Sequence, residues 1–389
     1  MEAPSLVGGT VGLILLRYGE VALKGQNRHE FLRCLRRNVR RCLQAHRIAG
    51  EVESVGQRLY VRTSQVEEAL EPLSRVFGLV SLSPVREVPR EMDAIIAAAI
   101  EEARAAGLSE STSFRVQARR ADKTFPYTSP EINRLVGEAV AQALGGHVDL
   151  SANADVTLGI EIAQDAALVF ARVIPAPGGF PLGVEGRVVA LISGGIDSPV
   201  AAWMMMKRGC YVIPLHFSQN DVETSKALDN IAQLGRYSYG WELRPIVLDH
   251  AATVTPTFEK LRAIGESRWN CIFCKRALIA KACQIAEEQE ALGVVMGDSL
   301  GQVASQSLAN MAAISYGAPL PILRPLIGLD KMEIIALARR IGTFSISTRA
   351  QAPCPFLPDH PITRGSLSKL REILNRLHAL EAEAHEPST

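Results

Sequence analysis

Short apolar runs alternate with longer helical patterns in the second half of the chain. The run Val188–Ile192 is apolar throughout, and a Ser/Gly cluster follows it, which is typical of a buried parallel strand. Further short runs lie at 211–217, 243–248 and 294–296, and helical patterns lie at about 199–207, 224–234, 274–290, 302–310 and 331–341. This alternation predicts an α/β domain with a doubly wound parallel sheet, whose ligand binds at the carboxyl ends of the strands.

The first half of the chain shows a mixed pattern. The apolar run Val11–Leu16 predicts a strand, and a loop with Lys24, Gly25 and Asn27 follows it. An amphipathic helix comes next, with Phe31, Leu35, Val39 and Cys42 on one face. Beyond residue 65 the pattern predicts helices at 66–77, 92–106 and 131–144 and extended segments at 79–88, 113–119, 155–161 and 167–172.

A Pro/Gly-rich stretch at 175–183 predicts a linker between two parts of the chain. We expect an N-terminal domain at 1–64, a second domain at 65–174, a linker at 175–184 and the α/β domain at 185–389. The N-terminal apolar run is too short for a signal peptide and nothing approaches a membrane span, so we expect a cytoplasmic protein with no membrane contact.

The charge of the chain is balanced overall but uneven locally. The formal net charge is +1, and 47% apolar with 21% charged residues describes a globular protein. Between Arg17 and Arg62, however, eleven Lys/Arg face only four acids. Such a run usually forms a solvated helix face, but the scarcity of acids gives a phosphate-binding surface at least equal weight. The candidate residues are Lys24, Arg36, Arg37 and Arg40.

A second basic segment begins at Ser113. Its strand places Phe114, Val116 and Ala118 on one face, and the loop after it holds Phe125 and Tyr127 among basic residues. Cations suit phosphates and aromatic rings suit unstacked bases, so this pattern favours RNA. The candidates here are Arg119, Arg120 and Lys123.

The Ser193–Ser198 segment, SGGIDS, joins the first strand of the α/β domain to a helix. Ser198 is a candidate N-cap and Pro199 suits the first helical position, so the turn should present backbone N–H groups to an anion. The sequence contains neither a G-x-x-x-x-G-K-[ST] loop nor a G-x-G-x-x-G turn after a strand. The alternative is an ordinary strand-to-helix turn.

This segment resembles the PP-loop of ATP pyrophosphatases, which cleave ATP between the α and β phosphates. The resemblance implies that the backbone of Gly194, Gly195 and Ile196 holds pyrophosphate together with the hydroxyls of Ser193 and Ser198. Asp197 would bind Mg²⁺ or orient the loop.

Four further blocks extend the resemblance to tRNA 4-thiouridine synthetases over almost the whole chain. They are LRYGEVALKGQNRHEF, FRVQARRADKTFPYTSPEI, GDSLGQVASQSLANM and RPLIGLDKMEI. The resemblance implies a ferredoxin-like domain, a THUMP domain that grips tRNA, and a PP-loop catalytic domain. It also implies ATP contacts from Leu191, Ile192, His216, Phe217, Lys275, Gly297 and Gln306.

Several of these residues also have structural interpretations. Leu191 and Ile192 are strand core in any case, and a lone His216 at a strand end is more often structural. Lys275 is expected to open a helix, where a cation is slightly unfavourable, which favours a functional role.

The chain has seven cysteines, an odd number that suits a reducing compartment better than a disulfide framework. Cys34 and Cys42 read as small core residues. Cys271 and Cys274 form a C-x-x-C expected just before a helix, and Cys354 lies in a proline-rich loop.

Three roles remain open for these three thiols. They could hold a [4Fe–4S] cluster with one iron free, as in related thiolases, or Cys354 could relay a persulfide. A zinc ion would need a fourth ligand, for which Cys283 and His360 are the candidates, although Cys283 has core spacing. We favour the cluster.

The resemblance implies that ATP activates O4 of uridine 8 and that sulfur then displaces AMP to give 4-thiouridine. No segment resembles the rhodanese-like domain of longer family members, so we expect an external donor, either sulfide or a cysteine desulfurase persulfide, and assign no thiazole-forming role. A homodimer is left open. The alternatives are another PP-loop thiolase or amide-forming synthetase, and a non-catalytic tRNA-binding module.

Overall fold

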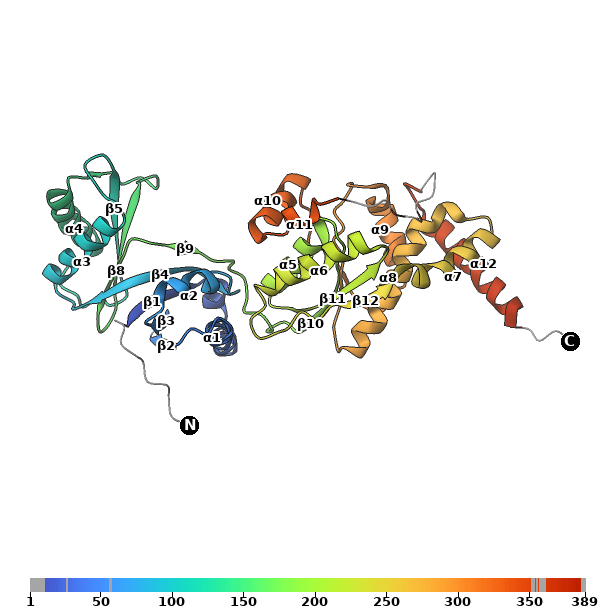
Figure 1. The fold of residues 1–389 in the computed structure, drawn as a ribbon, viewed down its shortest axis with the longest axis horizontal. Coiled ribbons are helices and arrows are strands. Elements are labelled where there is room, and N and C mark those ends of the chain that lie inside the picture. The colour runs from blue at the N-terminus through green and yellow to red at the C-terminus, as the bar shows by residue number, and fades with distance from the viewer. Residues whose placement is uncertain are drawn as a thin grey trace, which may run out of the picture. The chain divides into compact units, whose positions relative to one another are not determined.

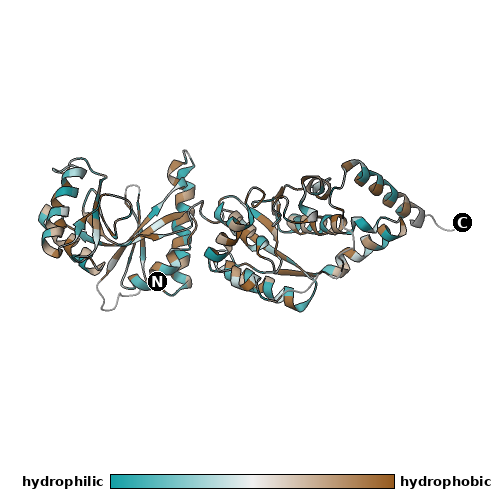
Figure 2. Ribbon diagram, turned by 90° about the horizontal axis from the view of Figure 1, so that it is seen from above, coloured by the Kyte–Doolittle hydropathy of each residue, from teal (hydrophilic) through white to brown (hydrophobic). Residues whose placement is uncertain are grey.

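The computed structural model describes residues 11–25, 27–55, 58–350, 354, 356 and 362–385. Two compact units divide the chain, the first ending at Gly179 and the second beginning at Phe180. Hydrophobic and hydrophilic residues alternate along the helices of both units (Figure 2). No helix among the described residues is long and apolar enough to cross a membrane.

The first unit is built on a nine-stranded sheet. Its first half holds β1 (Gly12–Tyr18), β2 (Glu51–Val55) and β3 (Arg58–Thr63), packed with α1 (Arg28–Ala45) and α2 (Val66–Leu73). The apolar face of α1 is buried as its spacing predicts, with Leu35, Val39 and Cys42 fully enclosed. A short 3-10 turn, η1 (Glu20–Leu23), connects β1 to this helix.

The strand β4 (Leu79–Val88) joins the two halves of that sheet (Figure 1). It pairs antiparallel with β1 through Leu79–Val85 and with β8 (Ala167–Phe170) through Arg86–Val88. The second half adds β7 (Val156–Ile162), β5 (Ser113–Arg120) and β6 (His147–Val148), while β9 (Ile174–Pro175) pairs with β4. The helices α3 (Met92–Ala105) and α4 (Ser129–Leu144) pack on this half.

The second unit contains a five-stranded sheet in the order β12-β11-β10-β13-β14, and all of its neighbouring strands are parallel. The strands are β10 (Arg187–Leu191), β11 (Tyr211–Ser218), β12 (Ile246–Asp249), β13 (Val294–Val295) and β14 (Ile322–Leu323). The predicted fold class, an α/β unit with a doubly wound parallel sheet preceded by α+β domains, is confirmed.

The helices of this unit lie around that sheet (Figure 1). They are α5 (Asp197–Lys207), α6 (Asp221–Gly235), α7 (His250–Ala263), α8 (Asn270–Glu288), α9 (Leu308–Ser315), α10 (Lys331–Ile341), α11 (Phe344–Ser347) and α12 (Leu367–His385), with 3-10 turns η2 (Ser267–Trp269) and η3 (Ala304–Gln306). Residues of α8, α9 and α12 share one apolar core with β10 and β11.

The predicted local structure differs from the observed one at α8 and α7. The helix expected from Cys274 begins at Asn270, so the C-x-x-C lies inside α8 and not before it. The segment 250–263 was not predicted as a helix, yet it forms α7. Its polar threonines and the internal Pro256 hide the helical pattern, and the Asp249 side chain caps it by accepting from the Ala252 N–H at 2.6 Å.

Candidate active site

The SGGIDS loop lies where the strand order of the second unit reverses. It follows β10, which has β11 on one side and β13 on the other. In open α/β sheets, the crevice outside the carboxyl ends of the strands at such a point is where ligands bind. The loop also leads directly into α5, so the unpaired N–H groups of the first turn of α5 lie at the end of the loop, where they can bind an anion.

Hydrogen bonds between its first and last residues hold the loop closed. The Ser198 hydroxyl accepts from the Ser193 N–H at 2.8 Å, and the two hydroxyl oxygens are 3.0 Å apart. The Gly195 N–H points to the Ser193 hydroxyl at 3.3 Å. The prediction that Ser198 caps the helix is therefore wrong. Ile196 is the N-cap and the Ser198 hydroxyl is bonded back into the loop, while Pro199 still lies in the first turn.

Two glycines let other segments approach this loop closely. A Cβ on Gly297, just beyond β13, would lie 2.7 Å from both the Ser198 nitrogen and its Cα. Those atoms are backbone and cannot move aside, so only glycine fits. A Cβ on Gly194 would collide with the side chains of Glu223 and Lys226.

Those two side chains form a buried ion pair beside the loop. The Lys226 ammonium lies 2.8 Å from a Glu223 carboxylate oxygen, and Lys226 is only 2% exposed. Both residues come from α6. A buried cation needs a compensating charge, so the pair is electrostatically coupled within the wall of the site.

Asp197, the predicted Mg²⁺ ligand, begins α5. Its carboxylate accepts from the Lys331 ammonium at 2.6 Å, which brings α10 to the loop. On the other side, the Ser347 hydroxyl donates to the Gly195 carbonyl at 3.1 Å. A half-buried carboxylate next to a phosphate loop suits Mg²⁺, which is usually held by one or two carboxylates together with substrate phosphates.

A second polar cluster centres on Asp298, directly after Gly297. The carboxylate contacts the Lys275 ammonium at 2.7 Å and the Arg324 guanidinium at 3.1 Å. Burial acts to raise the pKa of the Asp298 carboxyl, but the two cations together hold that pKa below its ordinary value. The Gln306 amide lies 3.4 Å from the same carboxylate. Three of the predicted ATP contacts, Lys275, Gly297 and Gln306, are thus brought together.

Lys275 does not lie where the sequence predicted. Because α8 begins at Asn270, Lys275 is in its second turn and does not open the helix. Lys275 is therefore not an unfavourable cation at a helix start, and its position in the helix does not indicate a functional role. Its ion pair with Asp298 is the observation that now connects it to the site.

His216 links the strand before the loop to α6. Its Nδ1 is 2.8 Å from the Ile192 carbonyl, and its Nε2 is 3.1 Å from the Thr224 hydroxyl. Burial lowers the pKa of the His216 ring, so the ring is neutral at pH 7. Phe217 is 8% exposed and Leu191 is half-buried, so these residues are chiefly part of the packed wall.

The thiols of Cys271 and Cys274 lie in the first turns of α8. Burial raises the pKa of Cys274 to about 12, and the charges of Cys354 and Cys271 act in the same direction. Burial also raises the pKa of Cys271, again with a contribution from Cys354. Cys354 is therefore within electrostatic reach of both thiols, and it is itself exposed. Cys274 and Lys275 are consecutive, so α8 carries part of each cluster.

Among the described side chains, no three His, Cys, Asp or Glu residues lie close enough to share one metal ion. Cys283 is 5% exposed and belongs to the apolar core, as its spacing predicted, and His360 lies outside the described residues. A single zinc ion therefore finds no ligand set among the described side chains. A [4Fe–4S] cluster binds each cysteine through a different iron, so its three protein ligands need not meet at one ion.

The basic residues predicted for RNA lie in the first unit. Arg37, Arg40, Arg119 and Lys123 are exposed, whereas Lys24, Arg36 and Arg120 are half-buried. Arg120 donates to the carbonyls of Phe125 and Tyr127 at 3.2 and 3.0 Å, which shapes the loop. Phe125 does not fit the expectation of a ring offered to a base, because it is 4% exposed and packs in the core. Tyr127 is 38% exposed and keeps that role open.

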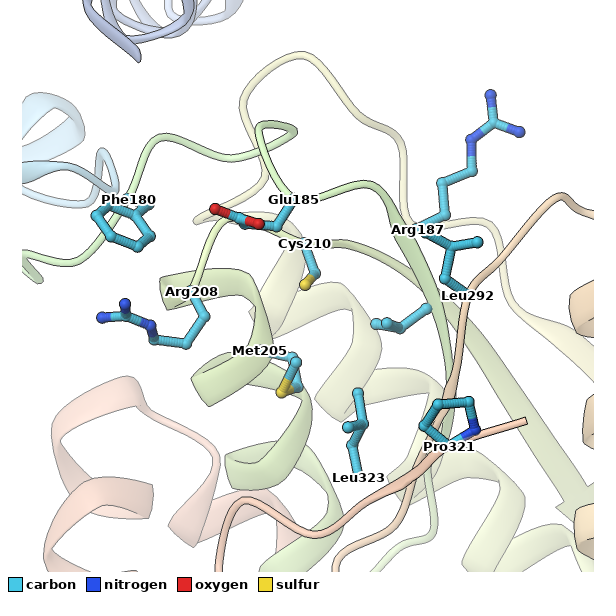
Figure 3. Close-up of a pocket in the computed structure, with 10 residues that line it drawn as sticks. Phe180, Glu185, Arg187, Met205, Arg208, Cys210, Leu292, Pro321 and Leu323 are labelled. Carbon is cyan, nitrogen blue, oxygen red and sulfur yellow. The ribbon is translucent and has the colours of Figure 1, made fainter. Parts of the chain in front are cut away.

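A separate pocket of about 450 Å³ lies at the end of the five-stranded sheet where β10 and β11 begin, opposite to the end that carries the SGGIDS loop (Figure 3). Arg187 and Val188 begin β10 there, and Cys210 immediately precedes β11. Burial raises the pKa of the Cys210 thiol to about 11. This pocket is remote from the loop after β10, and none of the predicted site residues lines it.

Sequence reasoning missed five residues of these clusters. Lys331, Asp298 and Arg324 stand inside the quoted blocks but were not singled out as site residues. Buried Lys226 and His250 carry no local signal, since each is placed by the packing of a helix. His250 lies 3.3 Å from the Cys274 sulfur.

Known protein families match both units of the chain. A family model described as "Thiamine biosynthesis protein (ThiI)" matches residues 183–378, a ThiI ferredoxin-like domain matches 13–83 and a THUMP domain matches 89–172. A probable tRNA sulfurtransferase of Thermococcus kodakarensis is 43% identical over 367 residues, which cover 93% of this chain and 96% of the relative. Another, of Methanocaldococcus jannaschii, is 40% identical over 371 residues, covering 94% and 97%.

One solved structure is similar along the whole chain. It is the crystal structure of a 4-thiouridine synthetase–RNA complex with bound ATP, with a TM-score of 0.79 and 30% identity. The likeness covers 96% of this chain and 97% of that one. A Pyrococcus horikoshii protein of known structure is similar with a TM-score of 0.68 and 30% identity, covering 85% and 99%.

Proposed function

The chain belongs to the ThiI family of tRNA sulfurtransferases, and from this premise we propose that it converts uridine 8 of tRNA to 4-thiouridine. In the first step ATP activates O4 of the uracil. In the second step sulfur replaces that oxygen. The similar 4-thiouridine synthetase bound to RNA and ATP supports both substrates.

One observation carries the proposal. The SGGIDS loop, the Gly297 turn and the Asp298 cluster meet at the carboxyl edge of the sheet, with Gly297 against the Ser198 backbone. A helix N-terminus, a phosphate loop, a carboxylate and two cations are the groups that adenylation needs, because it moves negative charge onto pyrophosphate.

In the activation step, O4 of the uracil attacks the α-phosphorus of ATP. The new O4–P bond forms as the bond to the β-phosphate oxygen breaks, and N3 of the base loses its proton. The Gly194, Gly195 and Ile196 backbone and the Ser193 and Ser198 hydroxyls bind the leaving pyrophosphate. Asp197 is the residue that would hold Mg²⁺, which would supply positive charge to neutralise the phosphates.

In the transfer step, a sulfur nucleophile adds to C4 and AMP departs with the former O4. AMP leaves readily, whereas an unactivated carbonyl oxygen does not. With sulfide as donor, the nucleophile is hydrosulfide and the base ends as the thiocarbonyl. With a persulfide on Cys354, the outer sulfur attacks, and a second thiol then cleaves the S–S bond and forms a disulfide with Cys354.

Cys271, Cys274 and Cys354 are the residues that would hold a [4Fe–4S] cluster, whose open iron would bind and present sulfide. The charge of Cys354 contributes to raising the pKa of both Cys271 and Cys274, which is the observation that connects the three thiols. The exposure of Cys354 equally suits a relay in which an external persulfide loads that thiol.

The first unit would bind the tRNA. Lys24, Arg36, Arg37 and Arg40 on or beside α1, together with Arg119, Arg120 and Lys123 at the end of β5, are the proposed phosphate contacts. Because they read charge and shape, we expect them to set affinity and orientation, with the uridine chosen at the catalytic unit.

The test is a single-turnover assay after anaerobic purification with iron and sulfide analysis. Protein, tRNA and ATP are mixed with sulfide or with a persulfide donor, and pyrophosphate release and the modified nucleotide are measured. We expect stoichiometric pyrophosphate and 4-thiouridine at position 8. Thiolation at another base would assign a different PP-loop thiolase, and tRNA binding without pyrophosphate release would leave only a binding module. Full activity without iron would favour the Cys354 relay.

A further inference from the structure

His250 connects the two segments that carry the candidate sulfur ligands. It is the first residue of α7, directly after β12, and only 1% of its surface is exposed. Neither the sequence motifs nor the activation chemistry uses it. A buried imidazole requires a reason for its position, because burying polar groups without partners costs free energy.

One contact of His250 is to the C-x-x-C. Its Nε2 lies 3.3 Å from the Cys274 sulfur, within hydrogen-bonding distance for sulfur. The other ring nitrogen, Nδ1, is buried and has no hydrogen-bond partner among the described residues. An unpaired buried N–H is rarer than an unpaired acceptor, so the tautomer with its proton on Nε2 is favoured. In that tautomer the ring donates to the sulfur.

The second contact is to the segment of Cys354. The His250 ring packs against Phe356 with centroids 5.4 Å apart, and Phe258, two turns along α7, packs on Phe356 at 5.6 Å. Phe356 follows Cys354 by two residues. One face of α7 thus anchors the chain beside Cys354, and His250 sits where that face meets Cys274.

We propose that His250 is a positioning residue of the thiol centre, whose Nε2–H donates to the Cys274 sulfur and whose ring anchors Phe356 so that Cys354 lies near Cys271 and Cys274. The sulfur role of this centre rests on the proposed function, but the two contacts do not. A donated N–H stabilises negative charge on sulfur, both in a metal-bound thiolate and in a persulfide.

Two variants separate the two contacts. His250→Phe keeps an aromatic ring against Phe356 and removes the N–H, whereas His250→Gln keeps an amide donor and removes the ring. Phe356→Leu removes the same ring contact from the other side. Val254→Ala, at a fully buried position on the same helix, is the control for a general loss of stability.

The hydrogen bond is tested first in the iron-free protein. Histidine labelled with ¹⁵N in the full chain, with the signal assigned by its loss in His250→Phe, should show the proton on Nε2. Cys274→Ala should shift that signal. A proton on Nδ1, or a signal indifferent to Cys274→Ala, would overturn the donor role, whether or not the protein binds iron.

The anchoring role is tested by mild oxidation of the iron-free protein and mapping of Cys354 disulfides with Cys271 or Cys274. We expect His250→Gln and Phe356→Leu to slow this cross-link several-fold, with His250→Phe and Val254→Ala close to the unmodified protein. Equal rates in all variants would overturn the anchoring role.

Iron-loaded protein supplies the third readout. Loss of a hydrogen bond to a metal ligand commonly costs about 10- to 100-fold in metal affinity. We therefore expect His250→Phe to release iron to a chelator about 10- to 100-fold faster, with His250→Gln in between. Unchanged release would contradict the donor role. If the unmodified protein takes up no iron, the cluster assignment fails, while the tautomer and cross-linking results still decide the role of His250.

Discussion

The SGGIDS loop and the thiol centre, formed by Cys271, Cys274 and Cys354, lie in the same unit but are built in different ways. The loop is one continuous segment, Ser193–Ser198, and its groups are backbone amides and short hydroxyls bonded to one another. The thiol centre needs α8, the segment of Cys354 and the face of α7 that contacts both. Chemistry built from backbone leaves a local motif in the sequence, whereas chemistry assembled from distant side chains does not.

The two clusters also differ in how they treat charge. Around the loop every buried charge has a partner, since Lys226 pairs with Glu223, and Lys275 and Arg324 share Asp298. Around the thiols burial instead raises the pKa of Cys271 and Cys274, so both favour the protonated form at neutral pH. The first cluster is therefore organised by its own ion pairs, whereas the second would, under the proposed function, be completed by the metal or sulfur species that it binds.

The largest expected effect comes from a substitution in the SGGIDS loop, which should stop activation and leave the thiols unaffected. Asp197→Ala removes the carboxylate that begins α5, and we expect tRNA-dependent pyrophosphate release to fall by about 100-fold or more. Affinity for tRNA and the cross-linking of Cys354 should not change. Asp229→Ala, which breaks an exposed ion pair with Arg349, is the matched control. Retained thiolation in Asp197→Ala would contradict the activation role.

The converse change removes the exposed thiol. With Cys354→Ala we expect formation of 4-thiouridine to fall by about 100-fold or more, because the sulfur nucleophile loses its carrier or ligand. Pyrophosphate release in the first turnover should continue. Cys210→Ala, at a buried thiol of the same unit, is the control. If pyrophosphate release is lost together with thiolation, the two clusters do not act separately.

A steric change tests whether the loop depends on its neighbours. Gly297→Ala places a methyl group 2.7 Å from the Ser198 backbone, so the start of α5 must shift. We expect roughly a 10- to 100-fold loss in pyrophosphate release, comparable to misplacing a catalytic group by about 1 Å. Gly328→Ala, where a Cβ meets nothing within 4 Å, should be silent. Normal ATP use in Gly297→Ala would show that the close approach is dispensable.

A smaller effect is expected at the first unit, where neither cluster lies. Reversal of Arg36, Arg37 and Arg40 to Glu should weaken tRNA binding about tenfold at moderate salt. It should also reduce the slope of log affinity against log salt by roughly one per lost phosphate contact. Rates at saturating tRNA should be unchanged. Arg104→Glu, exposed on α3, controls for charge alone. An unchanged slope would show that these arginines of α1 form a solvated surface and do not contact phosphates.

The smallest expected effect concerns pH and stability. Burial lowers the pKa of His216, so the folded protein binds fewer protons there than the unfolded chain does. The stabilising contribution of the neutral ring is complete above the ordinary imidazole pKa near 6.5. It is lost as the pH falls from there through the folded pKa. Urea midpoints at pH 7.5 and 5.5 should differ less in His216→Gln than in the unmodified protein, while His147→Gln, at an exposed histidine, changes nothing.

Much of the fold was predictable because its signals are local. The strand at Leu79–Val88 and the helix at Lys331–Ile341 match their predicted limits, since each shows a clear period and clear stop signals. The helix α7 was missed because its apolar positions are sparse and become a face only against Phe356 and the core. The start of α8 was misplaced for a related reason, since Ile272 and Phe273 in its first turn show that they belong to the helix only once their burial in the core is known.

The candidate site divides in the same way. Ser193–Ser198 and Gly297 could be predicted from motifs, because close packing requires the glycines and hydrogen bonds within the loop require the serine hydroxyls. The ion pairs of Asp197 with Lys331 and of Lys275 with Asp298 could not, because their partners are 134 and 23 residues apart. His250 was beyond reach, since its meaning depends on two contacts that only the packing of α7 creates.

The position of two thiols and one lysine on α8 bears on how much ATP the proposed reaction would use for each thiolated base. Cys271, Cys274 and Lys275 lie on its first turns, and four helical residues span about 6 Å along the axis. An adenylated uracil that meets water before sulfur returns to uridine, and one ATP is wasted. Under the proposed function, a rigid helix that carries groups of both steps this close together would let the activated base pass from activation to sulfur transfer without release. In that mechanism the helix would set the distance between the two steps and so limit the lifetime of the adenylated intermediate.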